Sequence, residues 1–91
     1  EPSDLSGFTS LCFTIYMEEG SGGVVRLEDS SGNESEDILF SDIVKEFNDE
    51  SPVEIDLHRL KGSNIDMENI KLIKFIGYKG AAFYISEVCL Q

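Results

Sequence analysis

The sequence predicts an all-β protein, an antiparallel β-sandwich or barrel that forms a single domain of 91 residues. Six short segments rich in β-branched and aromatic residues follow one another at intervals of about 10 to 15 residues. Glycine, serine and asparagine separate these segments, as is typical of turns between antiparallel strands. Apolar residues make up 41% of the chain, which is enough for a hydrophobic core and too many for a disordered segment.

The first strand is predicted at residues 11–17, where apolar and polar residues alternate with a period of two. One face carries Leu11, Phe13, Ile15 and Met17, and the other carries Cys12, Thr14 and Tyr16. After a glycine-rich turn, residues 24–28 form the second strand. Its two faces carry Val25 and Leu27 on one side and Val24 and Arg26 on the other.

Two further strands are predicted in the middle of the chain. The third begins near Ser35 and includes residues 38–40, and the fourth covers residues 53–57, opened by Pro52. Between them, residues 42–48 fit either an extension of the strand or a short turn of helix with Asp42 as its cap.

The last third of the chain predicts a short helical turn at residues 65–69, a fifth strand at residues 71–77 and a sixth at residues 82–90. In the fifth strand, Ile73 and Phe75 point inward and Lys74 points outward. Leu72 and Ile76 are apolar on the outward side, which fits a ligand-facing strip, a partner contact or a second packed face.

Composition restricts the function. The chain has 18 acidic and 7 basic residues and a formal net charge of −11, which argues against binding nucleic acid or anionic lipid. No apolar run is long enough to span a membrane. His58 is the single histidine, and neither a Cys/His cluster nor a nucleophile motif accompanies it. The protein is therefore expected to be neither a zinc protein nor an enzyme.

Four segments occur in an order that resembles a known family. They are Asp-Leu-Ser-Gly-Phe-Thr-Ser-Leu-Cys-Phe at residues 4–13, Val-Glu-Ile-Asp-Leu at 53–57, Asn-Ile-Lys-Leu-Ile-Lys-Phe at 69–75 and Phe-Tyr-Ile-Ser-Glu-Val at 83–88. Together they resemble the carbohydrate-binding modules of bacterial plant-cell-wall-degrading systems, which have a jelly-roll, galactose-binding-like fold. The resemblance covers residues 4–90.

The resemblance implies a secreted, non-catalytic protein that binds a neutral polysaccharide such as β-glucan, mannan or xyloglucan. Such binding targets an associated glycan-degrading enzyme or complex to its substrate. The alternative is a protein-interaction or assembly module on the same jelly-roll fold, because a fold does not determine a function.

Sugar-binding modules of this kind stack aromatic rings on sugars and form hydrogen bonds to their hydroxyl groups. The expected carbohydrate-binding residues are Tyr16, Arg26 and Tyr84 on outer strand faces and Tyr78 at a strand end. No cofactor is expected. Ser86 stands where the family has an aspartate that helps to hold a structural calcium, although Glu87 could still contribute.

The family pattern includes one or two strands before the first motif. The expectation is therefore that residues 1–91 form the C-terminal portion of a longer module, receive a strand from another chain, or form a shortened variant with a covered edge. Cys12 and Cys89 fall on the first and last predicted strands, where either a disulfide or two free thiols fit.

Overall fold

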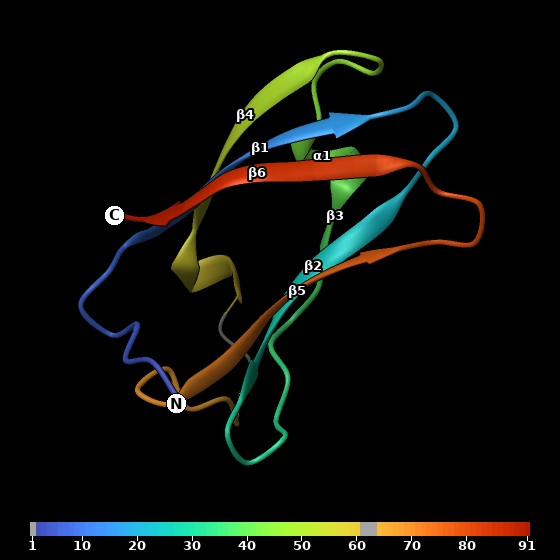
Figure 1. Cartoon of the computed structure of the whole chain (residues 1–91). Coiled ribbons are helices and arrows are strands. Elements are labelled where there is room, and N and C mark those ends of the chain that lie inside the picture. Colours follow the sequence, from blue (N-terminus) through green and yellow to red (C-terminus); the bar gives the residue numbers. More distant parts are fainter. Residues whose placement is uncertain (1, 61–63) are drawn as a thin grey trace.

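The computed structural model describes residues 2–60 and 64–91, and their strands form two antiparallel sheets (Figure 1). The strands are β1 (Ser10–Met17), β2 (Gly23–Asp29), β3 (Ile38–Leu39), β4 (Glu50–Asp56), β5 (Ile70–Gly77) and β6 (Phe83–Leu90). One sheet has the order β4-β1-β6, and the other has the order β3-β2-β5. A short helix, α1 (Phe40–Ile43), follows β3, and a 3-10 helix, η1 (Leu57–Leu60), follows β4. The prediction of an all-β protein is confirmed.

The inner faces of both sheets contribute to one hydrophobic core. Side chains along β1 and β4 alternate strictly between buried and more exposed positions, as a strand with one face on a core requires. Leu11 and Ile15 of one sheet and Val25 and Leu27 of the other are fully buried in the same cluster. The inner faces predicted for the first two strands are therefore confirmed.

Two connections cross between the sheets side by side. The turn at residues 18–22 joins β1 to β2, and the turn at residues 78–82 joins β5 to β6. These turns are tied together, because Tyr78 N donates to Gly22 O at 2.9 Å and Glu18 N donates to Ala82 O at 3.0 Å. As a result, β5 and β6 are edge strands on the same side of the molecule, which we call the open side (Figure 1).

Two facing glycines leave room for aromatic rings near these turns. Gly23 of β2 lies directly across from Gly77 of β5. A Cβ atom on Gly23 would lie 2.8 Å from Cε2 of Phe40, and one on Gly77 would lie 2.6 Å from Cε1 of Phe83. The Phe40 and Phe83 rings pack edge to face with centroids 5.2 Å apart. Since Phe40 is fully buried, α1 closes this end of the core.

Several sequence-based expectations need correction. The third strand has only the residues Ile38 and Leu39, because Ser35 turns inward and exchanges hydrogen bonds with the backbone of Leu27. Residues 42–48 do not extend a strand, and the short helix begins earlier, with Leu39 at its N-cap instead of Asp42. The fourth strand opens at Glu50, so Pro52 lies inside it, on an edge strand.

The chain after β4 also differs from the prediction. Residues 57–60 form η1, which the sequence reading did not anticipate. Residues 65–69 form a turn instead of a helical segment, since the Asp66 carboxylate accepts hydrogen bonds from Glu68 N and from Asn69 Nδ2. None of the helices in residues 2–60 and 64–91 is long and apolar enough to cross a membrane.

Candidate binding face

The outer face of the β4-β1-β6 sheet combines two tyrosines with hydroxyl and carboxylate groups. We call it the tyrosine face. The cross-strand register places its members: Ser10, Cys12, Thr14 and Tyr16 from β1, Glu50, Pro52, Glu54 and Asp56 from β4, and Tyr84, Ser86 and Cys89 from β6.

Tyr16 and Tyr84 are direct cross-strand neighbours at one end of this face. Their ring centroids are 6.1 Å apart and the ring planes are inclined by 50°. Tyr84 is 72% exposed and Tyr16 is half-buried. On the other side of Tyr16 lies Glu50 of β4, so one row across the sheet reads Glu50, Tyr16, Tyr84.

The next row across the sheet is Pro52, Thr14 and Ser86. The two rows together present aromatic surface beside hydrogen-bond donors and acceptors. Tyrosine rings offer apolar contact area, while phenol, carboxylate and hydroxyl groups can bond polar groups of a ligand. This combination suits a ligand with both apolar C–H faces and many hydroxyl groups.

Arg26 and Tyr78 do not join this pair, because Arg26 belongs to β2 and Tyr78 follows β5, both strands of the other sheet. Arg26 of β2 stands across from Lys74 of β5. Tyr78, just after β5, lies against Gly22 and is 55% exposed. Of the four residues that the sequence singled out, the structure therefore brings only Tyr16 and Tyr84 together.

Carboxylates already engage the guanidinium of Arg26. Its Nη2 donates to Asp37 Oδ2 at 3.0 Å, and its Nη1 donates to Glu34 Oε2 at 3.3 Å. Its Nε lies 2.7 Å from Asp37 Oδ1, a charge contact without hydrogen-bond alignment. Lys74 also pairs with Glu28 and Glu34, and Lys74 and Arg26 hold the pKa of the Glu34 carboxyl below its usual value. Arg26 therefore attaches the segment of residues 34–37 to its sheet.

An apolar row, which the sequence pattern predicted only in part, lies beside Arg26. Leu39, Val24 and Ile76 lie next to one another across β3, β2 and β5. Leu39 and Ile76 are exposed, and Val24 between them is buried. Strand alternation predicts the outward direction of Val24 and Ile76. It does not predict that of Leu39, because β3 has only two residues, too few to define an alternation.

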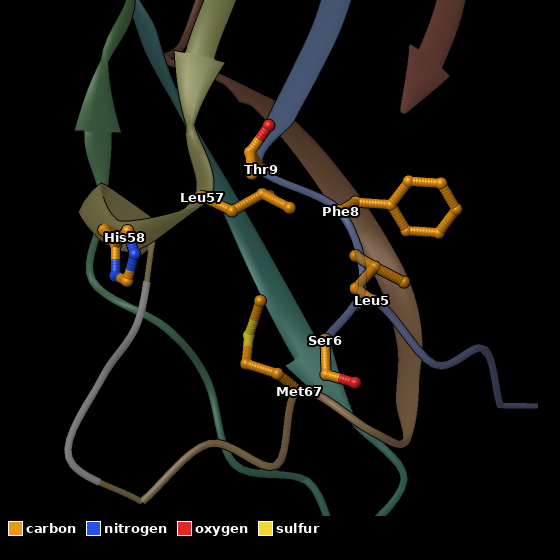
Figure 2. Close-up of a pocket in the computed structure, with 7 residues that line it drawn as sticks. All are labelled: Leu5, Ser6, Phe8, Thr9, Leu57, His58 and Met67. Atoms are coloured by element: carbon orange, nitrogen blue, oxygen red, sulfur yellow. The ribbon is translucent and has the colours of Figure 1, made fainter. Parts of the chain in front are cut away.

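A small pocket of about 280 Å³ lies under the N-terminal segment (Figure 2). Leu5, Leu57 and Met67 point into it, and Ser6 and His58 lie on opposite sides of it. The Ser6 hydroxyl donates to Asp4 Oδ1 at 2.6 Å, and His58 is exposed on η1. Among the residues that the structure describes, the pocket thus joins mainly apolar side chains and brings no activated nucleophile next to the histidine.

Ser86 and Glu87 are the positions at which the resemblance would place calcium ligands. Glu87 Oε2 accepts a 3.5 Å hydrogen bond from the Thr14 hydroxyl. In the part of the chain that the structure describes, no three His, Cys, Asp or Glu side chains are arranged to hold a metal ion.

Comparison with known proteins gives no relative: no family model, no curated protein and no solved structure matches the chain.

Proposed function

We propose that this protein is a secreted, jelly-roll carbohydrate-binding module whose tyrosine face binds a neutral polysaccharide. The observation that carries the proposal is the cross-strand pair of Tyr16 and Tyr84. Two adjacent, inclined rings offer stacking surface to consecutive sugar units, and Tyr84 is largely free to contact a ligand. Glu50, Thr14 and Ser86 are close enough in the sheet to bond sugar hydroxyl groups.

Charge selects the class of glycan. The net charge of −11 and the carboxylates on β4 would repel an acidic polysaccharide, whereas a neutral one carries hydroxyl groups that carboxylates accept well. β-Glucan, mannan and xyloglucan are therefore the ligands to test. The module would act by holding an associated glycan-degrading enzyme or complex near its substrate, which raises the effective concentration of the enzyme there.

The test is affinity electrophoresis and calorimetry with a panel of soluble neutral polysaccharides. We expect the Tyr84→Ala and Tyr16→Ala variants to bind at least about fivefold more weakly, since each loses a stacking contact worth about 1 kcal/mol. Tyr78→Ala is the matched control, because it removes an exposed tyrosine of the turn after β5, outside the tyrosine face, and should bind as the unaltered protein does. The proposal is refuted if no glycan of the panel slows the migration of the protein or gives heat of binding.

A second candidate function, protein interaction, has its own supporting observation on the open side. Inner-facing side chains of β1, β2 and β4 are almost fully buried, but those of β5 and β6 are, apart from Ile70, only partly buried. The partly buried core residues there are Ile73, Phe75, Phe83, Ile85 and Leu90. In the described parts of the chain, no strand pairs with the outer edge of β6, and on the outer edge of β5 only Ser3 forms a bridge, so both edges offer unpaired backbone groups to another strand.

The occupant that fits the open side is an extended polypeptide strand with alternating apolar side chains. Ser3 already forms an antiparallel bridge with Ile70, and its N–H and carbonyl exchange 2.8 Å hydrogen bonds with that residue. This bridge sets the register in which a strand would continue along the free edge of β5. Such a strand would add backbone hydrogen bonds and cover Ile73 and Phe75.

A fusion tests this second function. About six residues of alternating valine and threonine, a usual strand length, are joined ahead of the chain. We expect this fusion to raise the melting temperature. A fusion with proline at alternate positions should not raise it, because proline donates no backbone hydrogen bond. Sedimentation at increasing concentration shows whether a second copy supplies the strand instead. Equal melting temperatures for both fusions, with a monomer throughout, would exclude the strand.

A further inference from the structure

The two cysteines of the chain face each other on the tyrosine face. Cys12 of β1 and Cys89 of β6 are direct cross-strand partners, although they are 77 positions apart in the sequence. Residues directly opposite in antiparallel strands have Cα atoms about 4.5–5.5 Å apart, which lies within the range of about 4.4–6.8 Å found in disulfides. Both thiols are free, Cys89 is exposed, and Cys12 is half-buried.

A β-bulge in β6 produces this pairing. Tyr16 pairs with Tyr84 and Thr14 with Ser86, so an unbroken register would place Val88 opposite Cys12. The register shifts by one residue between Thr14 and Cys12, and Glu87 has the left-handed backbone angle φ = 55°. The shift brings Cys89 opposite Cys12 on the outer face and returns Leu90 to the inner face opposite Leu11.

A left-handed conformation is unfavourable for a residue other than glycine, so the fold maintains the bulge at some cost. A plain strand would have alternated Cys89 onto the core side with Phe83 and Ile85. Because of the bulge, Cys89 lies on the same face of the sheet as Cys12, which strand alternation alone would not allow.

We propose that Cys12 and Cys89 form a redox-active dithiol that closes to a disulfide joining β1 and β6. The oxidant is a small-molecule disulfide of the glutathione class. The thiolate of exposed Cys89 attacks one sulfur of the oxidant, forms a mixed disulfide and releases the first small thiol. The Cys12 thiolate then attacks the Cys89 sulfur, forms the protein disulfide and releases the second small thiol. Two protein thiols are oxidised, and one small disulfide is reduced to two thiols.

The environment of the two sulfurs supports this order of events. Burial raises the pKa of the Cys12 thiol above its usual value of 9.0, and the neighbouring Cys89 and the charge of Glu54 raise it further. Cys12 is thus mostly protonated at neutral pH, and the exposed Cys89 is the thiol that an oxidant reaches first. Closure would fasten β6, a partly buried edge strand, to the central strand of its sheet.

The proposal is tested by incubating the reduced protein with oxidised glutathione at low protein concentration. We expect a monomer whose intact mass is lower by two hydrogens and a proteolytic fragment that links Cys12 to Cys89. Because the bond closes a loop of most of the chain, the melting temperature of the oxidised protein should exceed that of the reduced protein by about 10 °C. Reduction with dithiothreitol should reverse both changes.

Two variants make the test specific. Cys89→Ser should gain only a glutathione adduct and show no shift of the melting temperature. The double variant Ser86→Cys/Cys89→Ser keeps two thiols on the same face, but as diagonal neighbours about 7–8 Å apart, and should close much more slowly. The proposal is wrong if the unaltered protein yields only glutathione adducts or intermolecular dimers, or if the diagonal pair closes equally fast.

Discussion

Among the residues that the structure describes, Asp29 forms the largest number of side-chain hydrogen bonds. It lies at the end of β2 and is 1% exposed. Its carboxylate accepts hydrogen bonds from Ser31 N, from Asn33 N and Nδ2, and from Asp66 N, at 2.9 to 3.1 Å. The bond from Asp66 joins the turn after β2 to the loop before β5. Asp29 thus fastens two segments that are far apart in the sequence.

These hydrogen bonds, the one from Asp66 N foremost, lower the pKa of Asp29 below its usual value of 3.8 in spite of burial. The ionised group therefore stabilises the fold above pH 3.8, and this contribution is lost as the pH falls through the lower pKa of the folded state. We expect Asp29→Asn to lower the melting temperature at pH 7 and the difference from the unaltered protein to shrink in strong acid. Thermal melts across the acid range measure both. Exposed Asp42→Asn is the control, and an equal effect of the two changes would contradict the role of Asp29.

Among the described glycines, Gly23 is the one at which an added methyl group would come closest to the backbone of another strand. A Cβ atom there would overlap the carbonyl oxygen of Ile76 and lie 2.8–2.9 Å from the Phe40 ring. Because the backbone itself must move, we expect Gly23→Ala to lower the free energy of unfolding by about 1–3 kcal/mol. Urea denaturation measures this change. Gly7→Ala, which meets no atom within 4 Å, should be close to neutral, and equal stabilities of the two variants would refute the steric argument.

At the scale of elements, strand alternation carried most of the predictable information. It placed the buried residues of β1, β2 and β4, because one face of each strand must meet the core. It also put Tyr16 and Tyr84 on outer faces, but it could not show that they are neighbours. That contact depends on the register between the first and last strands, which long-range packing decides.

The remaining features depend on interactions that are not periodic. The bulge at Glu87 changes the side of the sheet on which Cys89 lies, so parity counting fails beyond Ser86. Arg26 has the parity expected of an outer residue, yet Glu34 and Asp37 occupy its guanidinium because the loop after β2 folds back on the sheet. Hydrogen bonds of Ser35 likewise shorten the third strand, and hydrogen bonds to Asp66 make residues 65–69 a turn.

The short helix α1 matters chiefly through Phe40. That side chain is fully buried and packs against Phe83 of the opposite sheet and above Gly23. We expect Phe40→Ala to cost about 3–5 kcal/mol, a large share of the stability of a domain this small, as measured by urea denaturation. Phe47→Ala removes a ring that is 43% exposed and should cost less than about 1 kcal/mol. Similar costs for the two variants would mean that α1 does not close the core.

On the scale of the whole molecule, burial is uneven around the core. On the side formed by β3, α1 and β4, the inward side chains Ile38, Phe40 and Ile55 are buried, whereas the open side leaves Phe83 and Ile85 partly accessible. The tyrosine face and the cysteine pair both include β6. The partly buried edge strand β6 thus contributes residues to both the proposed glycan-binding site and the proposed disulfide.

The two edges of the β4-β1-β6 sheet allow an internal comparison of local stability. β4 and β6 both pair with β1, but Ile55 of β4 is fully buried while Ile85 of β6 is only partly so. Because local opening is easier where fewer apolar contacts must break, we expect amides of β6 bonded to β1 to exchange with deuterium faster than those of β4. Oxidation of Cys12 and Cys89 should slow exchange in β6 and leave β4 unchanged. Equal exchange in both strands of the reduced protein would show that β6 is locally as stable as β4. It would then argue against the proposal that another strand covers the open side.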